Sequence, residues 1–255
     1  MLTLAIALAL FPAMGFAWWL QRRLNNAGWV DTIWTFALGL AGVAVALVNA
    51  ATPRGALVAG LVAAWALRLG LYIVSRTAGA AEDARYAHFR TLWGAAYQSR
   101  MFGFLMIQAA AAALLLIPML LAATSPRPLG WADALAVLIM ATAVIGEGIA
   151  DRQLARFRAL PGNHGKVCNT GLWSVSRHPN YFFEWLHWLA YPVFALGADH
   201  AWAALLGPAF MYWLLVHVSG IPPLEAQMLR SRGELYRAYQ RRVSAFFPLP
   251  NGGTP

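Results

Sequence analysis

Apolar residues form seven long runs along the chain, and polar residues gather between the runs. Each run is close to the ~20 residues that an α-helix needs to cross a bilayer. Because backbone groups in lipid must be paired within the segment, we expect the runs to be helices. The pattern therefore predicts an all-α, polytopic integral membrane protein with seven transmembrane helices. The predicted spans are about 2–20, 28–50, 55–75, 101–123, 131–150, 180–197 and 201–221, followed by a cytoplasmic tail at 222–255.

The composition supports the same fold class. Hydrophobic residues make up 60% of the 255 residues and charged residues 11%, which excludes a soluble globular protein. The runs follow one another without a repeat, a low-complexity linker or a separate polar domain. We therefore predict a single seven-helix membrane domain that covers residues 1–255.

Basic residues predict the orientation in the membrane. They gather in every second linker, starting after the first span, and in the tail, whereas the other linkers hold only Arg54 and Arg127. Because cytoplasmic loops carry the excess of Lys and Arg, the N-terminus is predicted outside and the C-terminus in the cytoplasm. The net charge of +9 then lies mostly on the cytoplasmic face. It favours membrane lipids or a phosphorylated ligand over nucleic acid, and no obligate protein partner is indicated.

The most informative segment is 170–190, where polar residues precede and enter an apolar run. A helix that begins near Pro179 would place four polar residues on one face, at i, i+4, i+7 and i+11. Such a stripe inside a span indicates a functional site, because ionisable groups are costly in lipid. The alternative is an interfacial helix start that contacts headgroups. The stripe is Asn180, Glu184, His187 and Tyr191, and Arg177 and His178 precede it.

A second polar group ends the fifth span. Glu147, Asp151 and Arg158 share one helical face, and the turn-rich loop that follows ends at Lys166. One interpretation is a solvated helix end held by salt bridges. The other is a nucleotide site, in which acids accept hydrogen bonds from hydroxyl groups and arginines bind phosphate oxygens. A dinucleotide with a 2′-phosphate needs such a cluster of cations. Arg152, Arg156 and Arg177 lie in the same region.

Two ionisable residues lie deeper in the predicted spans. Asp31 and Arg68 either form an ion pair that reduces the cost of each in lipid, or form part of an active-site floor. Tyr86, in the loop segment 82–86, is either an acid or part of a capped loop helix. Glu184 and His187 match one half of a di-iron pattern, but no second pair exists, so no metal is predicted.

Several chain breaks are predictable. Prolines at 192 and 208 are expected to kink the last two spans. A short helix is expected to restart at Pro223 with Glu225 in its first turn, and to continue from Met228 through Tyr239. This tail carries arginines around Tyr236 and Tyr239. It is either an amphipathic stretch on anionic headgroups or a lid over a phosphate-bearing ligand.

Several motifs together resemble the steroid 5-alpha-reductase superfamily. The first is Gly171-Leu-Trp-x-x-x-Arg-His-Pro-Asn-Tyr-x-x-Glu184, and the second is Tyr236-Arg-Ala-Tyr-Gln-Arg-Arg-x-x-x-Phe-Phe-Pro248. The upstream motifs Trp29-Val-Asp-x-x-Trp34, Arg68-Leu-Gly-Leu and Glu82-Asp-Ala-Arg-Tyr86 resemble its bacterial membrane branch. The Arg-His-Pro-x-Tyr element alone is shared with sterol reductases and with membrane methyltransferases for isoprenylcysteine and phospholipids.

The resemblance implies a seven-helix enzyme of the bacterial inner membrane with its active site on the cytoplasmic side. The implied reaction is NADPH-dependent reduction of the conjugated C=C bond of a 3-oxo-Δ4 steroid or similar enone lipid, giving the 5α-reduced ketone. Two alternatives stay open. One is an S-adenosylmethionine-dependent lipid or isoprenylcysteine methyltransferase. The other is a non-catalytic module that binds lipid.

The resemblance also implies site residues. Asn180 and Glu184 match the nicotinamide end of the family's cofactor site, Asp151 and Arg158 match its adenosine and phosphate end, and Lys166 replaces a phosphate-binding Arg. Glu147 stands where steroid reductases carry Asn, and Asp31, Trp65 and Arg68 occupy the regions that hold the steroid ketone. The proton donor stays open among Asp31, Tyr86 and Arg68. The predicted catalytic residues are Asp31, Arg68, Tyr86 and Glu184. The predicted NADPH-binding residues are Glu147, Asp151, Arg156, Arg158, Lys166, Arg177, His178, Asn180, Tyr181, Glu184, Tyr236 and Tyr239.

Overall fold

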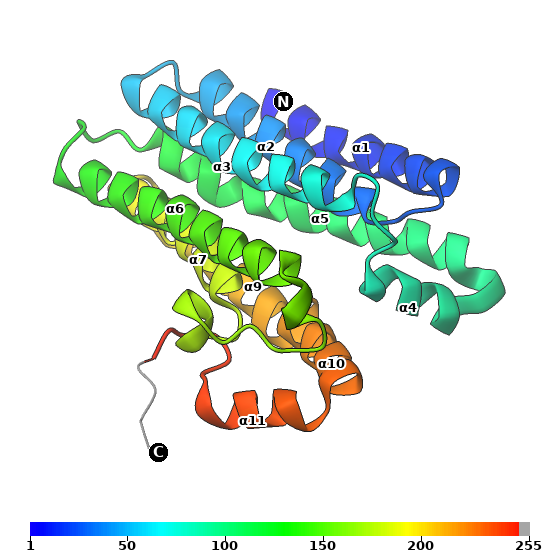
Figure 1. Cartoon of the computed structure of the whole chain (residues 1–255). Helices are drawn as coiled ribbons and strands as arrows, with labels where there is room; N and C mark the ends of the chain where they lie inside the picture. Colours follow the sequence, from blue (N-terminus) through cyan, green and yellow to red (C-terminus); the bar gives the residue numbers. More distant parts are fainter. Residues whose placement is uncertain (250–255) are drawn as a thin grey trace. The chain divides into compact units, whose positions relative to one another are not determined.

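The computed structural model describes residues 1–249, and these residues form helices and connecting loops without a β-strand (Figure 1). The chain divides into two compact units. Unit 1 contains Met1–Ala136 and Tyr191–Gly207, and unit 2 contains Val137–Ala190 and the chain from Pro208 onward. The prediction of a single domain over residues 1–255 stays a prediction.

Unit 1 is built around long helices. They are α1 (Leu2–Leu24), α2 (Trp29–Asn49), α3 (Pro53–Thr77) and α5 (Tyr97–Thr124). The short α4 (Ala84–Trp93) and the 3₁₀ turn η1 (Gly94–Ala96) connect α3 to α5, and α8 (Ala190–Phe194) and η4 (Ala201–Leu205) return later in the chain. Helix α2 packs against α1, α3 and α5.

Small residues allow the helices of unit 1 to pack closely. A Cβ on Gly39 would lie 2.2 Å from the Cβ of Ala66, and one on Gly70 would lie 2.4 Å from the ring of Phe36. Membrane helices associate largely through van der Waals contact between such small positions. The contact between α2 and α3 therefore depends on the absence of side chains at 39 and 70.

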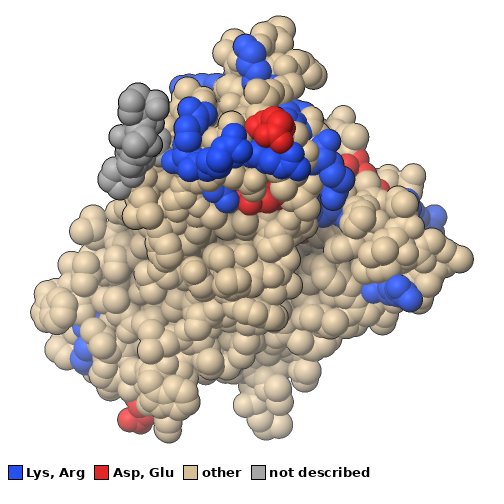
Figure 2. Space-filling model, turned by 90° about the horizontal axis from the view of Figure 1, so that it is seen from below, with Lys and Arg blue, Asp and Glu red and all other residues tan. Residues whose placement is uncertain are grey.

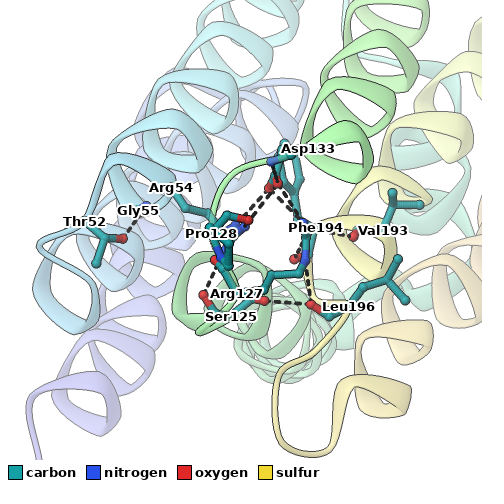
Figure 3. A network of polar contacts seen from close by, with 11 residues as sticks. Thr52, Arg54, Gly55, Ser125, Arg127, Pro128, Asp133, Val193, Phe194 and Leu196 are labelled. Carbon is teal, nitrogen blue, oxygen red and sulfur yellow. Dashed lines mark hydrogen bonds and ion pairs between the residues drawn. The ribbon is translucent and has the colours of Figure 1, made fainter.

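A network centred on Arg54 ties three loops and helix ends of unit 1 together (Figure 3). Arg54 follows Pro53 in the first turn of α3, whose N-cap Thr52 accepts a hydrogen bond from Gly55 N at 3.1 Å. The buried Arg54 guanidinium contacts Asp133 at 2.8 Å and donates to the carbonyls of residues 125, 127 and 128. Arg127 also contacts Asp133, at 2.7 Å, and donates to the Leu196 carbonyl at 2.7 Å. The two cations of the predicted outer loops are therefore used structurally.

Unit 2 contains most of α6 (Trp131–Ala159) together with α7 (Pro179–Trp188), most of α9 (Leu206–Trp213), the π-helix η5 (Leu214–Val218), α10 (Ile221–Arg232) and α11 (Glu234–Arg242). The 3₁₀ turns η2 (Pro161–Asn163) and η3 (Gly171–Ser174) lie in the loop between α6 and α7. Edge-to-face aromatic contacts join α7, α9 and the tail. They involve Phe182, Trp185, Tyr212, Phe246 and Phe247.

Within residues 1–249, six helical segments are long and apolar enough to cross a membrane. The predicted span 180–197 differs from these, because it divides into α7 and α8, with a break at Leu189. Pro192 explains the position of the break, since it cannot donate a hydrogen bond to the carbonyl of residue 188. The chain is a multi-pass helical membrane protein, whereas the seventh span and the orientation stay predictions.

The tail differs from prediction in two places. Helix α10 begins at Ile221, so both prolines lie in its first turn, and Glu225 lies beyond that turn. The expected continuous helix from Met228 through Tyr239 is interrupted at Gly233, whose φ of +52° favours glycine. This interruption allows α11 to pack back on the unit. Tyr236, Tyr239 and Val243 are buried there against Val167, Met228 and Leu229.

Candidate functional site

Asp31, Arg85 and Tyr86 form a compact polar cluster in unit 1. The Tyr86 hydroxyl donates to Asp31 Oδ1 at 2.7 Å, and Arg85 Nη2 contacts Asp31 Oδ2 at 2.6 Å. Tyr86 is buried, whereas the Asp31 side chain keeps 23% of its surface exposed. A buried hydroxyl on a partly exposed carboxylate is an arrangement that can pass a proton between solvent and a bound molecule.

The start of α4 positions this cluster. Asp83 is the N-cap of α4 and accepts from Arg85 N at 2.9 Å, and its carboxylate also contacts Arg85 Nε at 3.0 Å. Burial raises the pKa of Asp83, but the charge and hydrogen bonds of Arg85 outweigh this and leave it below its usual value. Asp83 is therefore ionised at neutral pH.

A neighbouring contact fixes the loop before α4. Glu82 accepts from the backbone N–H of Ala27 at 3.0 Å and pairs with Arg90 at 2.9 Å. The α1–α2 and α3–α4 loops are thus joined beside the Asp31 cluster.

Asp31 pairs with Arg85, and its expected ion pair with Arg68 stays a prediction. Arg68 lies half-buried on α3, with its guanidinium 5.6 Å from the ring centre of Tyr72. The alternation of apolar and polar residues located Asp31 and Arg68 in the inner parts of their spans. It could not show that the loop helix α4 folds back and brings Arg85 to Asp31.

Unit 2 buries the predicted acids of α6 and α7. Glu147, Asp151 and Glu184 are 4%, 3% and 7% exposed. Helix α6 approaches α7 closely, because a Cβ on Gly146 would lie 2.4 Å from the ring of Phe183. The Trp173 indole donates to the carbonyl of Ala150 at 3.0 Å and joins the loop before α7 to α6.

The predicted stripe on α7 is present only in part. The helix begins at Pro179 as predicted, and Glu184 and His187 lie buried on it, with the His187 ring 2.7 Å from the Glu184 carbonyl oxygen. Asn180 and Tyr181 are half-buried in its first turn, and the Tyr181 ring stacks on His178. Tyr191 belongs to α8 and to unit 1, so the predicted face ends at the break.

Arg177 and His178 bind a carboxylate of the same unit. Arg177 Nε contacts Glu225 Oε1 at 2.6 Å, and His178 Nε2 lies 3.2 Å from the same atom. Arg177 also donates to the carbonyl of Val243 at 2.5 Å. Burial lowers the pKa of His178 below its usual value, despite the opposing hydrogen bond to Glu225. These contacts give Arg177 and His178 a structural part in joining α7, α10 and the tail, and their cofactor contacts stay predictions.

The predicted tail tyrosines also point inward. The Tyr236 hydroxyl donates to Glu225 at 3.2 Å, and the Tyr239 hydroxyl donates to the carbonyl of Trp173. Burial raises the pKa of both phenols, which therefore stay protonated at neutral pH.

Two adjoining cavities open on unit 2, with volumes of about 270 and 380 Å³. They share Phe157, Asn163 and Lys166 in their walls. The other lining residues of the first are Leu154, Arg158, His164, Gly165, Cys168, Met228 and Arg232. The second is completed by Val167, Asn169, Leu235, Ala238, Tyr239 and Arg242. Four cations and several apolar side chains thus surround one hollow region.

The predicted cations fall into two groups, those that line the cavities and those that do not. Arg158 and Lys166 line them, whereas Arg152 and Arg156 are exposed on α6 and are not among their lining residues. Arg232 and Arg242 complete the cationic wall. Arg242 was predicted only as one of the tail arginines in the lid interpretation, and Arg232 had no predicted site role. The fold of α11 back on the unit at Gly233 brings Arg242 to the cavity, and only the tail's basic, aromatic composition hinted at this. Figure 2 shows a dense group of Lys and Arg side chains on one part of the surface.

Within residues 1–249, no group of three or more His, Cys, Asp or Glu side chains is arranged so that it could hold a metal ion. The free Cys168 is buried, and burial raises the pKa of its thiol.

Comparison with known proteins places the chain in a family. It matches the family model described as "Protein of unknown function (DUF1295)" over residues 17–243. It is also 40% identical over 85 residues to an uncharacterized protein of Schizosaccharomyces pombe, which covers 32% of this chain and 24% of that protein. The chain thus spans about a quarter of the length of this relative. No solved structure matches. Because the family model covers most of the sequence, the chain belongs to the DUF1295 family.

Proposed function

We propose that the protein is an NADPH-dependent membrane reductase of the steroid 5-alpha-reductase superfamily. Its proposed substrate is a 3-oxo-Δ4 steroid or similar enone lipid, and its product is the 5α-reduced ketone. In this proposal, unit 2 holds the cofactor and unit 1 supplies the acid. We place the enzyme in the bacterial inner membrane with the cofactor on the cytoplasmic side, in agreement with the basic linkers.

The observation that carries the proposal is the cationic wall of the two cavities. Arg158, Lys166, Arg232 and Arg242 surround a region that also offers apolar surface at Phe157 and Leu235. Such a combination suits a nucleotide, whose phosphates pair with cations and whose base packs on apolar groups. S-Adenosylmethionine has no phosphate, and its sulfonium and ammonium groups outweigh its one carboxylate, so clustered cations oppose its binding. The methyltransferase alternative is therefore disfavoured.

The residues of unit 2 fit the cofactor in two regions. The adenosine and its 2′-phosphate fit the cavities, where Arg158 and Lys166 would hold the phosphate. The nicotinamide end is assigned to Asn180 and Glu184 on α7. The ribose hydroxyls are assigned to the buried carboxylates Glu147 and Asp151 on α6.

Unit 1 supplies the proton in the proposed reaction. NADPH, when bound, supplies the hydride that adds to the β-carbon of the enone. Tyr86 would donate its proton to the ketone oxygen, where negative charge develops, and Asp31 would restore that proton. Among the three predicted donors, Tyr86 is favoured because its hydroxyl is buried and already hydrogen-bonded to Asp31.

Ligand-induced stabilisation tests the three candidate functions directly. A ligand that binds only the native protein raises its unfolding temperature. We expect NADPH to raise the unfolding temperature of the detergent-solubilised protein, and S-adenosylmethionine to leave it unchanged. The protein with NADPH and progesterone should also yield the saturated ketone. Stabilisation by S-adenosylmethionine alone would support the transferase, and stabilisation by neither ligand would support a lipid-binding module.

Removing a cation from the cavity wall should weaken the binding of NADPH more than the binding of NADH. Arg158→Ala is expected to weaken NADPH binding by roughly tenfold to a hundredfold, because one charge-assisted contact is lost. NADH affinity should change much less, since NADH lacks the 2′-phosphate. The loss should be larger at low ionic strength, where charges are less screened. Titration calorimetry of both cofactors at two salt concentrations measures these effects.

Arg152→Ala is the matched control for this experiment. Arg152 is an exposed cation of the same helix that does not line either cavity. We expect it to leave the affinity for both cofactors unchanged. Equal losses for the two variants would show that the cations act only through the general field of the surface.

A further inference from the structure

Two of the four cations in the cavity wall come from the tail, and each belongs to a different helix. We propose that Arg232 on α10 binds the 2′-phosphate of the cofactor and so selects NADPH over NADH, whereas Arg242 on α11 binds the pyrophosphate that both cofactors carry. This inference rests on the proposed reductase function and divides its cofactor site into two phosphate subsites.

Each helix of the tail lines one of the two cavities. Met228 and Arg232 lie one turn apart on α10, and both line the first cavity. The second cavity is lined by a stripe of α11 with helical spacing, which consists of Leu235, Ala238, Tyr239 and Arg242. Gly233, whose φ is +52°, forms the corner between the two helices. The corner therefore assigns one tail arginine to each cavity.

The cations of the wall have no carboxylate beside them to balance their charge. Among the residues that the structure describes, no Asp or Glu lines either cavity. By contrast, Arg177 and Arg237 of the same unit are paired with Glu225 and Glu234. Cations that surround one hollow repel one another, so an anion placed in the hollow is attracted by all of them.

Both tail arginines keep hydrogen-bond donors that a phosphate can use. Arg232 donates from Nε to the Lys166 carbonyl at 3.4 Å and from Nη1 to the Ser231 carbonyl at 3.3 Å. Arg242 donates from Nε to the Ala238 carbonyl at 3.3 Å. Within residues 1–249, these contacts leave Nη2 of Arg232 and both Nη atoms of Arg242 for a ligand. The planar guanidinium suits the oxygens of a phosphate.

The number of cations around each cavity indicates which phosphate it would hold. The first cavity gathers Arg158 from α6, Lys166 from the following loop and Arg232 from α10. A phosphate monoester carries about 1.5 to 2 negative charges and three acceptor oxygens, which suits three convergent cations. The second cavity has Lys166 and Arg242, together with the side-chain amide of Asn169. Because each phosphate of a pyrophosphate diester carries a single charge, fewer cations balance it.

Alanine substitutions of the two tail arginines should affect the two cofactors differently. Arg232→Ala is expected to weaken NADPH binding by roughly tenfold to a hundredfold, the range of a lost charge-assisted contact, and to leave NADH affinity nearly unchanged. Arg242→Ala should weaken NADPH and NADH by similar factors, because both carry the pyrophosphate. Titration calorimetry of the full-length protein in detergent measures the four affinities.

Two fragments of the cofactor give an independent readout. Adenosine 2′-monophosphate carries the phosphate monoester without the pyrophosphate, and ADP carries the pyrophosphate without the 2′-phosphate. The affinity for adenosine 2′-monophosphate should fall in Arg232→Ala and not in Arg242→Ala. The affinity for ADP should show the reverse pattern. Neither measurement depends on enone reduction.

Neighbouring arginines on the same helices provide matched controls. Arg230 on α10 and Arg241 on α11 are exposed and line neither cavity. Arg230→Ala and Arg241→Ala should leave all affinities nearly unchanged, because salt screens cations that do not touch the ligand. Arg232→Lys keeps the charge but loses the planar fork, so it should keep part of the preference for NADPH. The unfolding temperature without ligand checks that each variant is folded.

The outcomes separate this inference from the proposed function. Equal losses of NADPH and NADH affinity in Arg232→Ala, or equal losses in Arg230→Ala and Arg232→Ala, would overturn the phosphate assignment and leave an observed enone reduction standing. The expected fragment pattern without enone reduction by the wild-type protein would overturn the reductase function and leave the two subsites. A wild-type protein that binds neither NADPH nor either fragment would overturn both.

Discussion

Tyr86→Phe is expected to slow enone reduction by roughly two to four orders of magnitude, the range that general acid catalysis contributes. The substitution removes the hydroxyl that donates to Asp31 at 2.7 Å and retains the ring, which contacts Phe89 edge-to-face. Because unit 2 is assigned the cofactor, NADPH affinity should stay unchanged. Stopped-flow measurement of NADPH oxidation gives the rate, and titration calorimetry gives the affinity.

Tyr97→Phe provides the matched control for Tyr86→Phe. Tyr97 is a second buried tyrosine of unit 1, and its hydroxyl has no hydrogen-bond partner within residues 1–249. Its removal should leave the rate within a factor of a few. If Tyr86→Phe and Tyr97→Phe reduced the rate equally, Tyr86 would be a packing residue. The acid would then have to be sought elsewhere in unit 1.

The membrane-spanning helices were predictable because their cause is local. Runs of apolar residues near the thickness of a bilayer can satisfy their backbone groups only as helices, so the runs in 2–75 and 101–150 match observed helices. The same reasoning did not predict the division of the span at 180–197 into two helices. Its hydrophobicity resembles that of the others, but the break three residues before Pro192 divides it into pieces too short to cross alone.

The sequence predicted which segments carry the candidate site residues, but it did not predict which side chains these residues contact. Asp31 was identified because an ionisable residue inside a span is costly without a purpose. Tyr86, Arg158 and Lys166 were identified from polar clusters in the linkers and from the family resemblance. Their contacts depend on loop geometry that no periodicity encodes. The pairing of Asp31 with Arg85 depends on where α4 returns, and the place of Arg242 in the cavity wall depends on the turn at Gly233.

Arg177 shows how a motif can carry both structure and function. The Arg-His-Pro-x-Tyr element resembles a cofactor-binding motif, yet Arg177 and His178 both contact Glu225. Glu225 was expected only to begin a tail helix. Instead it also accepts from Tyr236 and Gln240, so one carboxylate joins the motif to α10 and α11. The tail carries two acids, Glu225 and Glu234, among five arginines, and this composition gave no signal for the donors that Glu225 accepts from.

Arg54→Ala is expected to cost about 3–5 kcal/mol of stability, the range for breaking one side of a buried ion pair. Arg54 is 3% exposed and Asp133 4% exposed, so the substitution leaves a buried carboxylate with fewer donors. It also removes the donors to the carbonyls of Ser125 and Pro128, which hold the loop between α5 and α6 to the start of α3. Equilibrium unfolding in mixed detergent micelles measures the loss.

Two further variants distinguish the buried pair from a general effect of charge. Arg127→Ala should cost much less, roughly 1 kcal/mol or below, because Arg127 is 22% exposed at its side chain and Asp133 keeps Arg54. The double variant Arg54→Met with Asp133→Leu should recover most of the stability lost in Arg54→Ala, since it leaves no unpaired buried charge. In the double variant the carbonyls of Ser125 and Pro128 would still lack the donors that Arg54 supplies, so the stability should be recovered only in part. If the double variant were no more stable than Arg54→Ala, the network would act through its hydrogen bonds to the loop rather than through the ion pair.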